Sequence, residues 1–114
     1  MKKTITLKKN YEFKRILTRG KYYSGNYIEI FVTNNQLKNH IGIAISVKIA
    51  KAVKRNRIKR LIRENYRLME DAIKVGYNIV FLWKKKANIE DATFENIKRD
   101  MNKIFQKAGI IGNV

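Results

Sequence analysis

Residues Lys48–Arg67 have the sequence KIAKAVKRNRIKRLIRENYR, in which nine of twenty positions are Lys or Arg and only Glu64 is acidic. Apolar residues recur through this stretch at helical spacing, which predicts one long helix over about residues 52–73. At about 100° per residue, one arc of that helix is apolar and forms a core stripe: Ile58, Leu61, Ile62, Leu68, Met69 and Ala72. The opposite arc is polar and mostly basic: Asn56, Lys59, Arg60, Arg63 and Arg67.

The basic arc is suited to binding phosphate. An Arg side chain presents a planar fork that can hold two oxygens and stays charged at any working pH. Asn56 adds a neutral donor and acceptor for a sugar, a base edge or a backbone group. The alternative is an ordinary solvated face, but such faces normally mix charges in i,i+4 pairs. Here Glu64 and Glu70 are expected only at the margins.

The composition favours a folded, strongly cationic protein. The chain has 114 residues, 45% of them hydrophobic, which predicts one domain over residues 1–114 with its own core. Its 26 basic and 9 acidic residues give a net charge of +17. That charge predicts an anionic partner, because the free protein repels itself. Nucleic acid is favoured over an anionic membrane or an acidic protein, so we interpret the chain as a single RNA-binding domain.

The residue types present argue against several other classes. There is no Cys and a single His, so neither a disulfide framework nor a Cys- or His-based metal site is expected. No apolar run approaches the roughly 20 residues of a membrane span, and the N-terminal segment lacks the apolar centre of a secretory signal. We therefore expect a cytoplasmic protein. The carboxylates are scattered and no catalytic motif occurs, so no catalytic and no metal-ligating residues are predicted.

The rest of the pattern predicts a mixed α/β (α+β) sandwich. Strands are expected at 21–24, 27–33, 41–47 and 77–83, the last being nearly all apolar and therefore central. Besides the basic helix, helices are expected over 11–19, capped by Asn10, and over 92–108. The order is α-β-β-β-α-β-α, with one four-stranded, mainly antiparallel sheet.

A second candidate surface is aromatic. Tyr27 and Phe31 alternate onto one strand face together with Glu29, so that face is not expected to be a closed core. The first helix should lie near the sheet, giving a groove lined by Phe13, Leu17, Tyr27 and Phe31. Aromatic grooves beside basic residues bind single-stranded RNA, because bases stack on the rings. The alternative is that these aromatic residues are ordinary core. The small residues at positions 42, 44 and 46 share one strand face, which could either form the bottom of the groove or let a helix pack closely.

Residues 48–63 resemble the signature of the bacterial ribonuclease P protein family: AV, one residue, RN followed by R or K, two residues, and R. Here that pattern is Ala52-Val53-Lys54-Arg55-Asn56-Arg57, with Arg60 after two more residues. The segments 7–10 with Phe13, and 42–46, also resemble this family, and the order of elements matches over nearly the whole chain.

The resemblance implies a left-handed β-α-β crossover within a ribosomal protein S5 domain 2-like fold. It also implies a protein subunit of an endoribonuclease that removes the 5′ leader of precursor tRNA. The RNA subunit performs the cleavage with magnesium, and no cofactor is bound firmly by the protein. The expected partners are the catalytic RNA and the precursor tRNA leader, with neither a membrane nor an obligate protein partner.

By position, the family's helix residues that bind the catalytic RNA correspond to Arg55, Asn56, Arg57, Lys59, Arg60 and Arg63. We add Lys48, Lys51 and Arg67, which extend the same basic segment. The leader cleft corresponds to Phe13, Leu17 and Phe31, to which the alternation of the strand adds Tyr27. The family often has an aromatic residue at the position of Leu17 and a Tyr at that of Phe31.

Three other functions remain to be distinguished. A structural RNA-binding protein of the ribosomal type would bind RNA with similar salt sensitivity but would have no role in cleavage. A DNA-binding regulator would place the basic helix in the major groove and show base-pair specificity, usually with a dimer seam. A membrane-surface helix is the weakest alternative, because the core requires its apolar arc.

Overall fold

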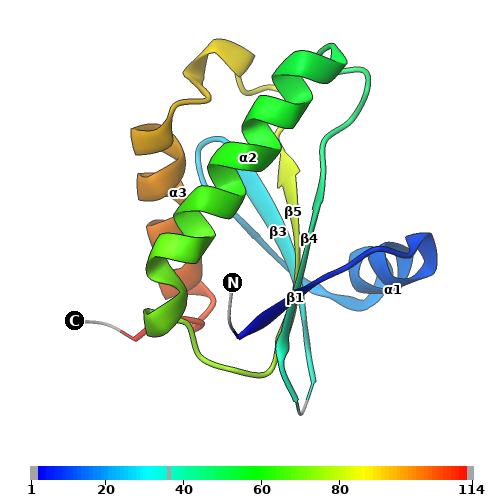
Figure 1. Ribbon diagram of the computed structural model, residues 1–114, viewed down its shortest axis with the longest axis vertical. Helices are drawn as coiled ribbons and strands as arrows, with labels where there is room; N and C mark the ends of the chain where they lie inside the picture. Colours follow the sequence, from blue (N-terminus) through cyan, green and yellow to red (C-terminus); the bar gives the residue numbers. More distant parts are fainter. Residues whose placement is uncertain (1–2, 36, 113–114) are drawn as a thin grey trace.

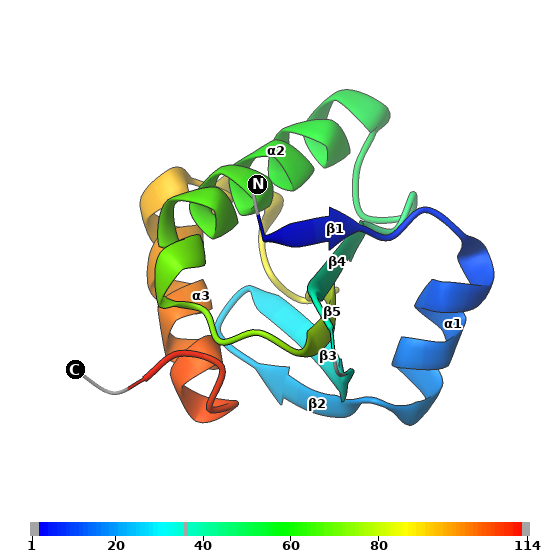
Figure 2. The ribbon, with the colours of Figure 1, turned by 60° about the horizontal axis from the view of Figure 1, so that its bottom comes forward.

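The computed structural model describes residues 3–35 and 37–112 as a five-stranded sheet with helices on both faces (Figure 1). The strands are β1 (Thr4–Thr6), β2 (Lys21–Ser24), β3 (Ile28–Asn34), β4 (Asn39–Ala44) and β5 (Tyr77–Trp83). The helices are α1 (Asn10–Arg19), α2 (Ala52–Met69) and α3 (Phe94–Lys107), with short 3₁₀ turns at Glu70–Ala72 and Ile89–Asp91. Helices α2 and α3 cover one face of the sheet and α1 lies on the other (Figures 1 and 2).

The sheet order is β1-β4-β5-β3-β2, so β5 is central as predicted. The four predicted strands pair mainly antiparallel, as expected, but the sheet has one strand more than predicted. The β1–β4 and β4–β5 pairs are parallel, whereas β3–β5 and β2–β3 are antiparallel. The additional strand, β1, has only three residues, which is too short for an alternating pattern to predict.

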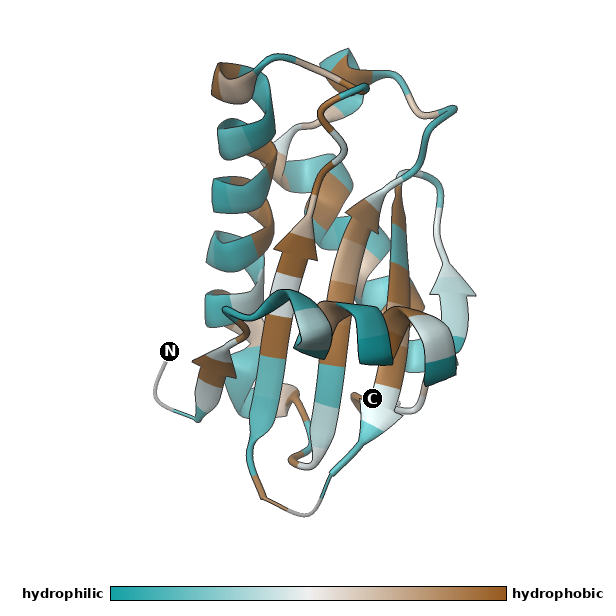
Figure 3. Ribbon diagram, turned by 90° about the vertical axis from the view of Figure 1, so that its right-hand side faces the viewer, coloured by the Kyte–Doolittle hydropathy of each residue, from teal (hydrophilic) through white to brown (hydrophobic). Residues whose placement is uncertain are grey.

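The crossover from β4 through α2 to β5 is left-handed. In Figure 3 both strands run upward, the long helix α2 lies behind the sheet, and β5 stands to the right of β4. Seen from the side on which α2 lies, β5 therefore stands to the left of β4, and this placement defines a left-handed crossover. Such crossovers are right-handed in about 98% of cases, so this uncommon hand agrees with what the family resemblance implies.

The sheet separates a large core from a small one. Alternate residues of β3 and β5, including Ile28, Ile30, Ile79 and Phe81, are fully buried toward α2 and α3. There the ring of Tyr66 from α2 contacts the rings of Phe81 and Phe105 edge-on, both at 6.5 Å between centroids. On the other face Leu7, Ile16 and Val80 form the small core beneath α1. Because α1 is short, part of that face stays accessible.

The core stripe of α2 differs from the predicted one at its C-terminal end. Ile58 and Ile62 are buried, and Leu61 and Met69 are half-buried, as expected. Leu68, however, is 60% exposed, and Ala72 is exposed in the 3₁₀ turn that follows the helix. The residues of α2 that are buried near this end are Asn65 and Tyr66. The Asn65 side-chain amide donates to the Leu61 and Phe94 carbonyl oxygens at 3.0 and 3.3 Å.

Several boundaries also differ from the predictions. Asn10 is the first residue of α1 and does not cap it; instead the Glu12 carboxylate accepts the Lys9 backbone N–H at 3.3 Å. The strand expected over 41–47 ends at Ala44, and α3 begins after Thr93, whose hydroxyl accepts the Asn96 N–H at 3.1 Å. Among the described helices, none has the length and apolarity required to cross a bilayer.

Candidate nucleic-acid interface

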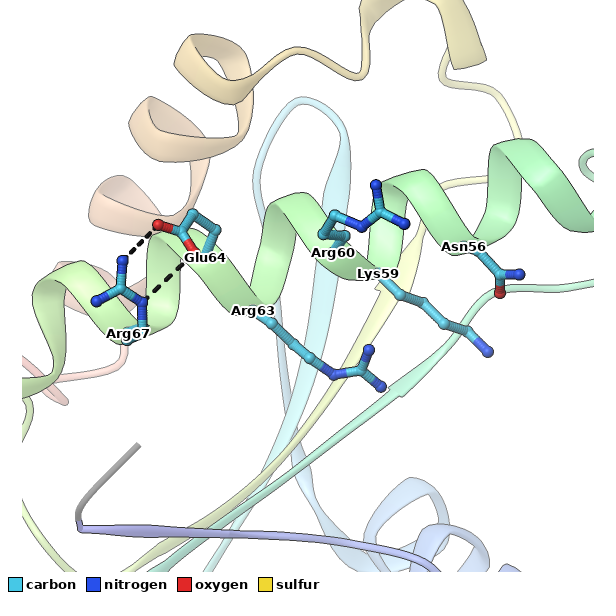
Figure 4. Close-up of a pocket in the computed structure, with 6 residues that line it drawn as sticks. All are labelled: Asn56, Lys59, Arg60, Arg63, Glu64 and Arg67. Carbon is cyan, nitrogen blue, oxygen red and sulfur yellow. Dashed lines mark hydrogen bonds and ion pairs between the residues drawn. The ribbon is translucent and has the colours of Figure 1, made fainter.

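The basic arc of α2 forms a continuous surface, as predicted. Its residues line one shallow groove along the exposed side of the helix (Figure 4): Asn56, Lys59, Arg60, Arg63, Glu64 and Arg67. Within the described parts of the chain, Lys59, Arg60 and Arg63 make no ion pair or side-chain hydrogen bond, so their donors are available to a ligand. We call this surface the basic row.

Glu64 lies within the basic row rather than at its margin. Its carboxylate accepts from the Arg67 guanidinium at 2.5 Å, one helical turn away (Figure 4). This hydrogen bond holds the pKa of Glu64 below its ordinary value. Arg67 is thus partly neutralised in the free protein, and the unpaired charge is concentrated on the three residues in the middle of the row.

The other basic residues predicted to bind RNA lie outside this groove. Arg55 is half-buried and donates to the Ala50 carbonyl oxygen at 2.7 Å, so it also fixes the loop that leads into α2. Lys48 and Lys51 are exposed on that loop. Arg57 is exposed near Glu90, whose pKa is lowered first by a 2.9 Å hydrogen bond from Lys54 and more weakly by Arg57.

Of the four residues predicted to line an aromatic groove, Phe13, Leu17 and Phe31 lie on the side of the sheet that carries α1. Cross-strand register places Gly42, Val80, Phe31 and Tyr22 side by side across four strands. The Phe31 and Tyr22 rings are 5.2 Å apart and tilted by 55°. Phe13 from α1 packs against the same small core as Phe31, and Leu17 is 36% exposed on α1. We call Phe13, Leu17, Tyr22 and Phe31 the aromatic groove.

Tyr27 does not belong to the aromatic groove, contrary to the prediction. It precedes β3 and packs against the large core on the opposite face, where its ring stacks on Trp83 at 5.8 Å and 13°. The Asp100 carboxylate accepts the Tyr27 backbone N–H at 2.9 Å. This contact turns the chain before the strand begins, so the alternation that holds from Ile28 onward does not extend back to Tyr27.

Tyr22 is the groove residue that the sequence did not predict. It is 49% exposed, and its hydroxyl donates to a Glu29 carboxylate oxygen. That hydrogen bond is the main reason why the pKa of Tyr22 is raised. Strand β2 has four residues with two consecutive tyrosines, so its pattern could not show which ring faces the groove.

A close contact explains the small residue at position 42. A Cβ atom on Gly42 would lie 2.5 Å from two ring carbons of Phe13. Gly42 therefore lets α1 pack closely on β4, which was one of two roles considered for it. The other two small residues contribute less to the packing of α1 on the sheet. Ala44 is half-buried at the end of β4, and Ser46 is exposed beyond the strand.

We expect Gly42→Ala to lower the free energy of unfolding by about 1–3 kcal/mol, the usual cost of overpacking. The added methyl group must displace the Phe13 ring or part β4 from α1. Urea unfolding followed by circular dichroism measures the change. Gly112→Ala is the matched control, because a Cβ there meets no atom within 4 Å; equal stabilities for the two variants would contradict the close packing.

A hollow at the tip of the β2–β3 hairpin adjoins the aromatic groove. It is lined by Asn26, Glu29, Lys84, Lys85, Lys86 and Ala87. The Lys84 amine donates to the Gly25 carbonyl oxygen at 2.8 Å, whereas Lys85 and Lys86 are exposed.

Over residues 3–35 and 37–112, no three His, Asp or Glu side chains are grouped so that they could hold a metal ion.

Comparisons with known proteins agree on one family. The family profile named Ribonuclease P matches residues 1–109. The ribonuclease P protein component of Fusobacterium nucleatum is 45% identical over 109 residues, covering 93% of this chain and 98% of the relative. The structure of the RNase P protein from Thermotoga maritima is similar with a TM-score of 0.80 and 25% identity, covering 90% and 96% of the two chains. That from Staphylococcus aureus gives a TM-score of 0.78 at 25% identity, covering 94% and 97%.

Proposed function

Because this chain belongs to the ribonuclease P protein family and acts with an RNA subunit in tRNA 5′ maturation, we propose that its two surfaces divide the RNA contacts. In this proposal the basic row docks the RNA subunit. The aromatic groove holds the single-stranded 5′ leader of precursor tRNA. The chain takes part in an endoribonuclease holoenzyme, and we propose that it does so in the cytoplasm.

The observation that carries the docking role is the row of cations on α2, where Lys59, Arg60 and Arg63 have no ion-pair partner among the described residues. Arg63 lies about one turn from both Lys59 and Arg60, so the three side chains project from adjacent turns of one rigid helix. Such a row can follow a phosphate backbone, and its two guanidinium groups can each hold two oxygens. Arg55, Arg57, Lys48 and Lys51 would extend the contact around the N-terminal end of α2.

The leader-binding role is supported by three aromatic rings, of which Tyr22 is exposed and Phe13 and Phe31 are half-buried. A ring binds a base by stacking whatever the base, which suits leaders of differing sequence. The groove lies on the face of the sheet opposite α2, so one protein molecule could contact both RNAs at once. Contact with the leader would then strengthen the binding of precursor tRNA relative to mature tRNA.

We further propose that the RNA subunit carries out the cleavage with magnesium that the RNA binds. The proposal is supported by the chemistry of the basic row, in which Lys59, Arg60 and Arg63 present ammonium and guanidinium groups and the one carboxylate, Glu64, is hydrogen-bonded to Arg67. Arg cannot give up its proton at neutral pH, so these groups bind and orient RNA instead of acting as a general base. Cleavage of precursor tRNA by the protein alone would contradict this assignment.

Phe31→Ala should reduce the preference for precursor over mature tRNA about tenfold, because stacking of one base contributes roughly 1–3 kcal/mol. Binding to the RNA subunit should be unchanged. The measurement is the dissociation constant of each tRNA from the assembled holoenzyme. Tyr11→Ala is the control, since that ring is 58% exposed outside the groove. Equal losses for precursor and mature tRNA would refute the leader-binding role.

A further inference from the structure

A carboxylate lies beside the groove proposed to bind a polyanion. Glu29 is on β3, on the same face as Phe31, and is paired in register with Ser24 on one side and Leu82 on the other. It also lines the hollow that contains Lys85 and Lys86. A groove that bound RNA through phosphate charge alone would be weakened by a negative charge at this position. The placement therefore indicates another contribution from Glu29.

The side chain is held in place by its neighbour across the hairpin. The Tyr22 hydroxyl donates to Oε2 of Glu29, and the Tyr22 ring in turn contacts Phe31. Across residues 3–35 and 37–112 this is the only hydrogen bond that the Glu29 carboxylate makes, and it makes no ion pair. Oε1 is thus an acceptor without a partner in this part of the chain, beside a ring on which a base could stack.

A carboxylate in this position can distinguish bases by the hydrogen-bond donors on their edges. An ionised carboxylate only accepts hydrogen bonds. Adenine, cytosine and guanine each carry an exocyclic amino group, and Glu is known as a partner for the cytosine amino group. Uracil instead has carbonyl oxygens on both sides of its one N–H. A carboxylate facing those oxygens is repelled.

We propose that Glu29, held by Tyr22, contacts the edge of one leader base and favours a base with an exocyclic amino group over uracil. The proposal rests on the leader-binding role of the aromatic groove. In this arrangement the base stacks on Phe31 or Tyr22, its amino group donates to Glu29, and an adjoining phosphate lies on Lys85 and Lys86. The two lysines offset the repulsion between Glu29 and the RNA backbone.

A purely structural role of Glu29 would lead to a different experimental result. If Glu29 only ties β2 to β3 through Tyr22, its removal should lower stability and weaken every leader equally. If it contacts a base, its removal should change the ratio between leaders. The ratio is measured with the same RNA subunit throughout, so any preference contributed by that RNA cancels between protein variants.

The test uses the reconstituted holoenzyme and precursor tRNAs that differ only in their leaders, one all cytidine and one all uridine. With the natural protein we expect the cytidine leader to bind roughly three- to tenfold more tightly, in the lower range of a good base contact. Glu29→Val should bring this ratio close to one while both leaders still bind better than mature tRNA. Glu29→Gln keeps the side-chain volume and offers an amide donor to uracil, so it should narrow the ratio as well.

Two results would overturn the inference and are distinguishable. An unchanged ratio in Glu29→Val and Glu29→Gln, with leader preference intact, would refute base discrimination but leave the leader-binding role standing. If, with the natural protein, neither precursor tRNA bound more tightly than mature tRNA, both the base discrimination and the leader-binding role would be refuted. Melting curves of the variants separate a loss of folding from a loss of discrimination, and Glu29→Gln supplies the result if Glu29→Val does not fold.

Discussion

Replacement of both Arg60 and Arg63 by alanine is expected to weaken assembly with the RNA subunit roughly a hundredfold, because hydrogen bonds to charged groups contribute about 1.5–3 kcal/mol each. Both side chains are exposed and unpaired within the described residues, so the folded protein should lose little stability. The loss should appear as a weaker association constant measured by titration of the RNA with protein.

The salt dependence of the same variant separates specific contacts from bulk charge. Each lost phosphate contact should reduce the slope of log K against log salt by about 0.7 if the contacted RNA is single-stranded. The control is Lys98→Ala with Arg99→Ala, which removes equal charge from exposed positions on α3. If the control loses as much affinity as the α2 variant, net charge and not the basic row explains the binding.

Asp100→Ala is expected to lower the free energy of unfolding by about 3–5 kcal/mol, since three backbone N–H donors would lose their buried acceptor at once. Asp100 is 3% exposed on α3, and its carboxylate accepts the backbone N–H groups of Asn26, Tyr27 and Ile28 at 2.6, 2.9 and 2.8 Å. These residues form the turn between β2 and β3. The variant should therefore also loosen the hairpin that carries Tyr22, Glu29 and Phe31.

Urea unfolding measures the effect, with Asp71→Ala as control. The Asp71 side chain is fully exposed, and among the residues that the structure describes it pairs only with Lys3, at 3.7 Å, so its removal should change stability by less than about 1 kcal/mol. The loss of stability for Asp100→Asn should fall between those of Asp100→Ala and Asp71→Ala. An amide keeps one oxygen acceptor but places an N–H donor against the other backbone N–H groups. A loss for Asp100→Ala as small as that of the control would show that the turn does not depend on this carboxylate.

The elements that could be predicted are those with long, regular patterns. Strand β5 is a continuous apolar run and has the predicted bounds, and α2 has a clear apolar period and begins at the predicted residue, although it ends at Met69 and not near residue 73. The basic row follows directly from the helical period. Strand β1, in contrast, has three residues and depends on its pairing with β4, which no local pattern reveals.

The aromatic groove was only partly predictable, because tertiary contacts decide which ring faces it. The contact of Asp100 with the Tyr27 N–H joins residues 73 positions apart and helps turn Tyr27 toward the large core. The pairing of Tyr22 with Glu29 depends on the register of a short hairpin. In α2, the end of the helix at Met69 leaves Leu68 exposed although its apolar character suggested burial.

The most direct test of the account is reconstitution with a bacterial ribonuclease P RNA at low magnesium concentration. The rate of 5′ cleavage of precursor tRNA is measured with the RNA alone, the protein alone and both together. We expect cleavage to be strongly stimulated when both are present, with a product that ends at the mature 5′ terminus of the tRNA. An RNA that cleaves no faster with the protein than without it would contradict the proposed role.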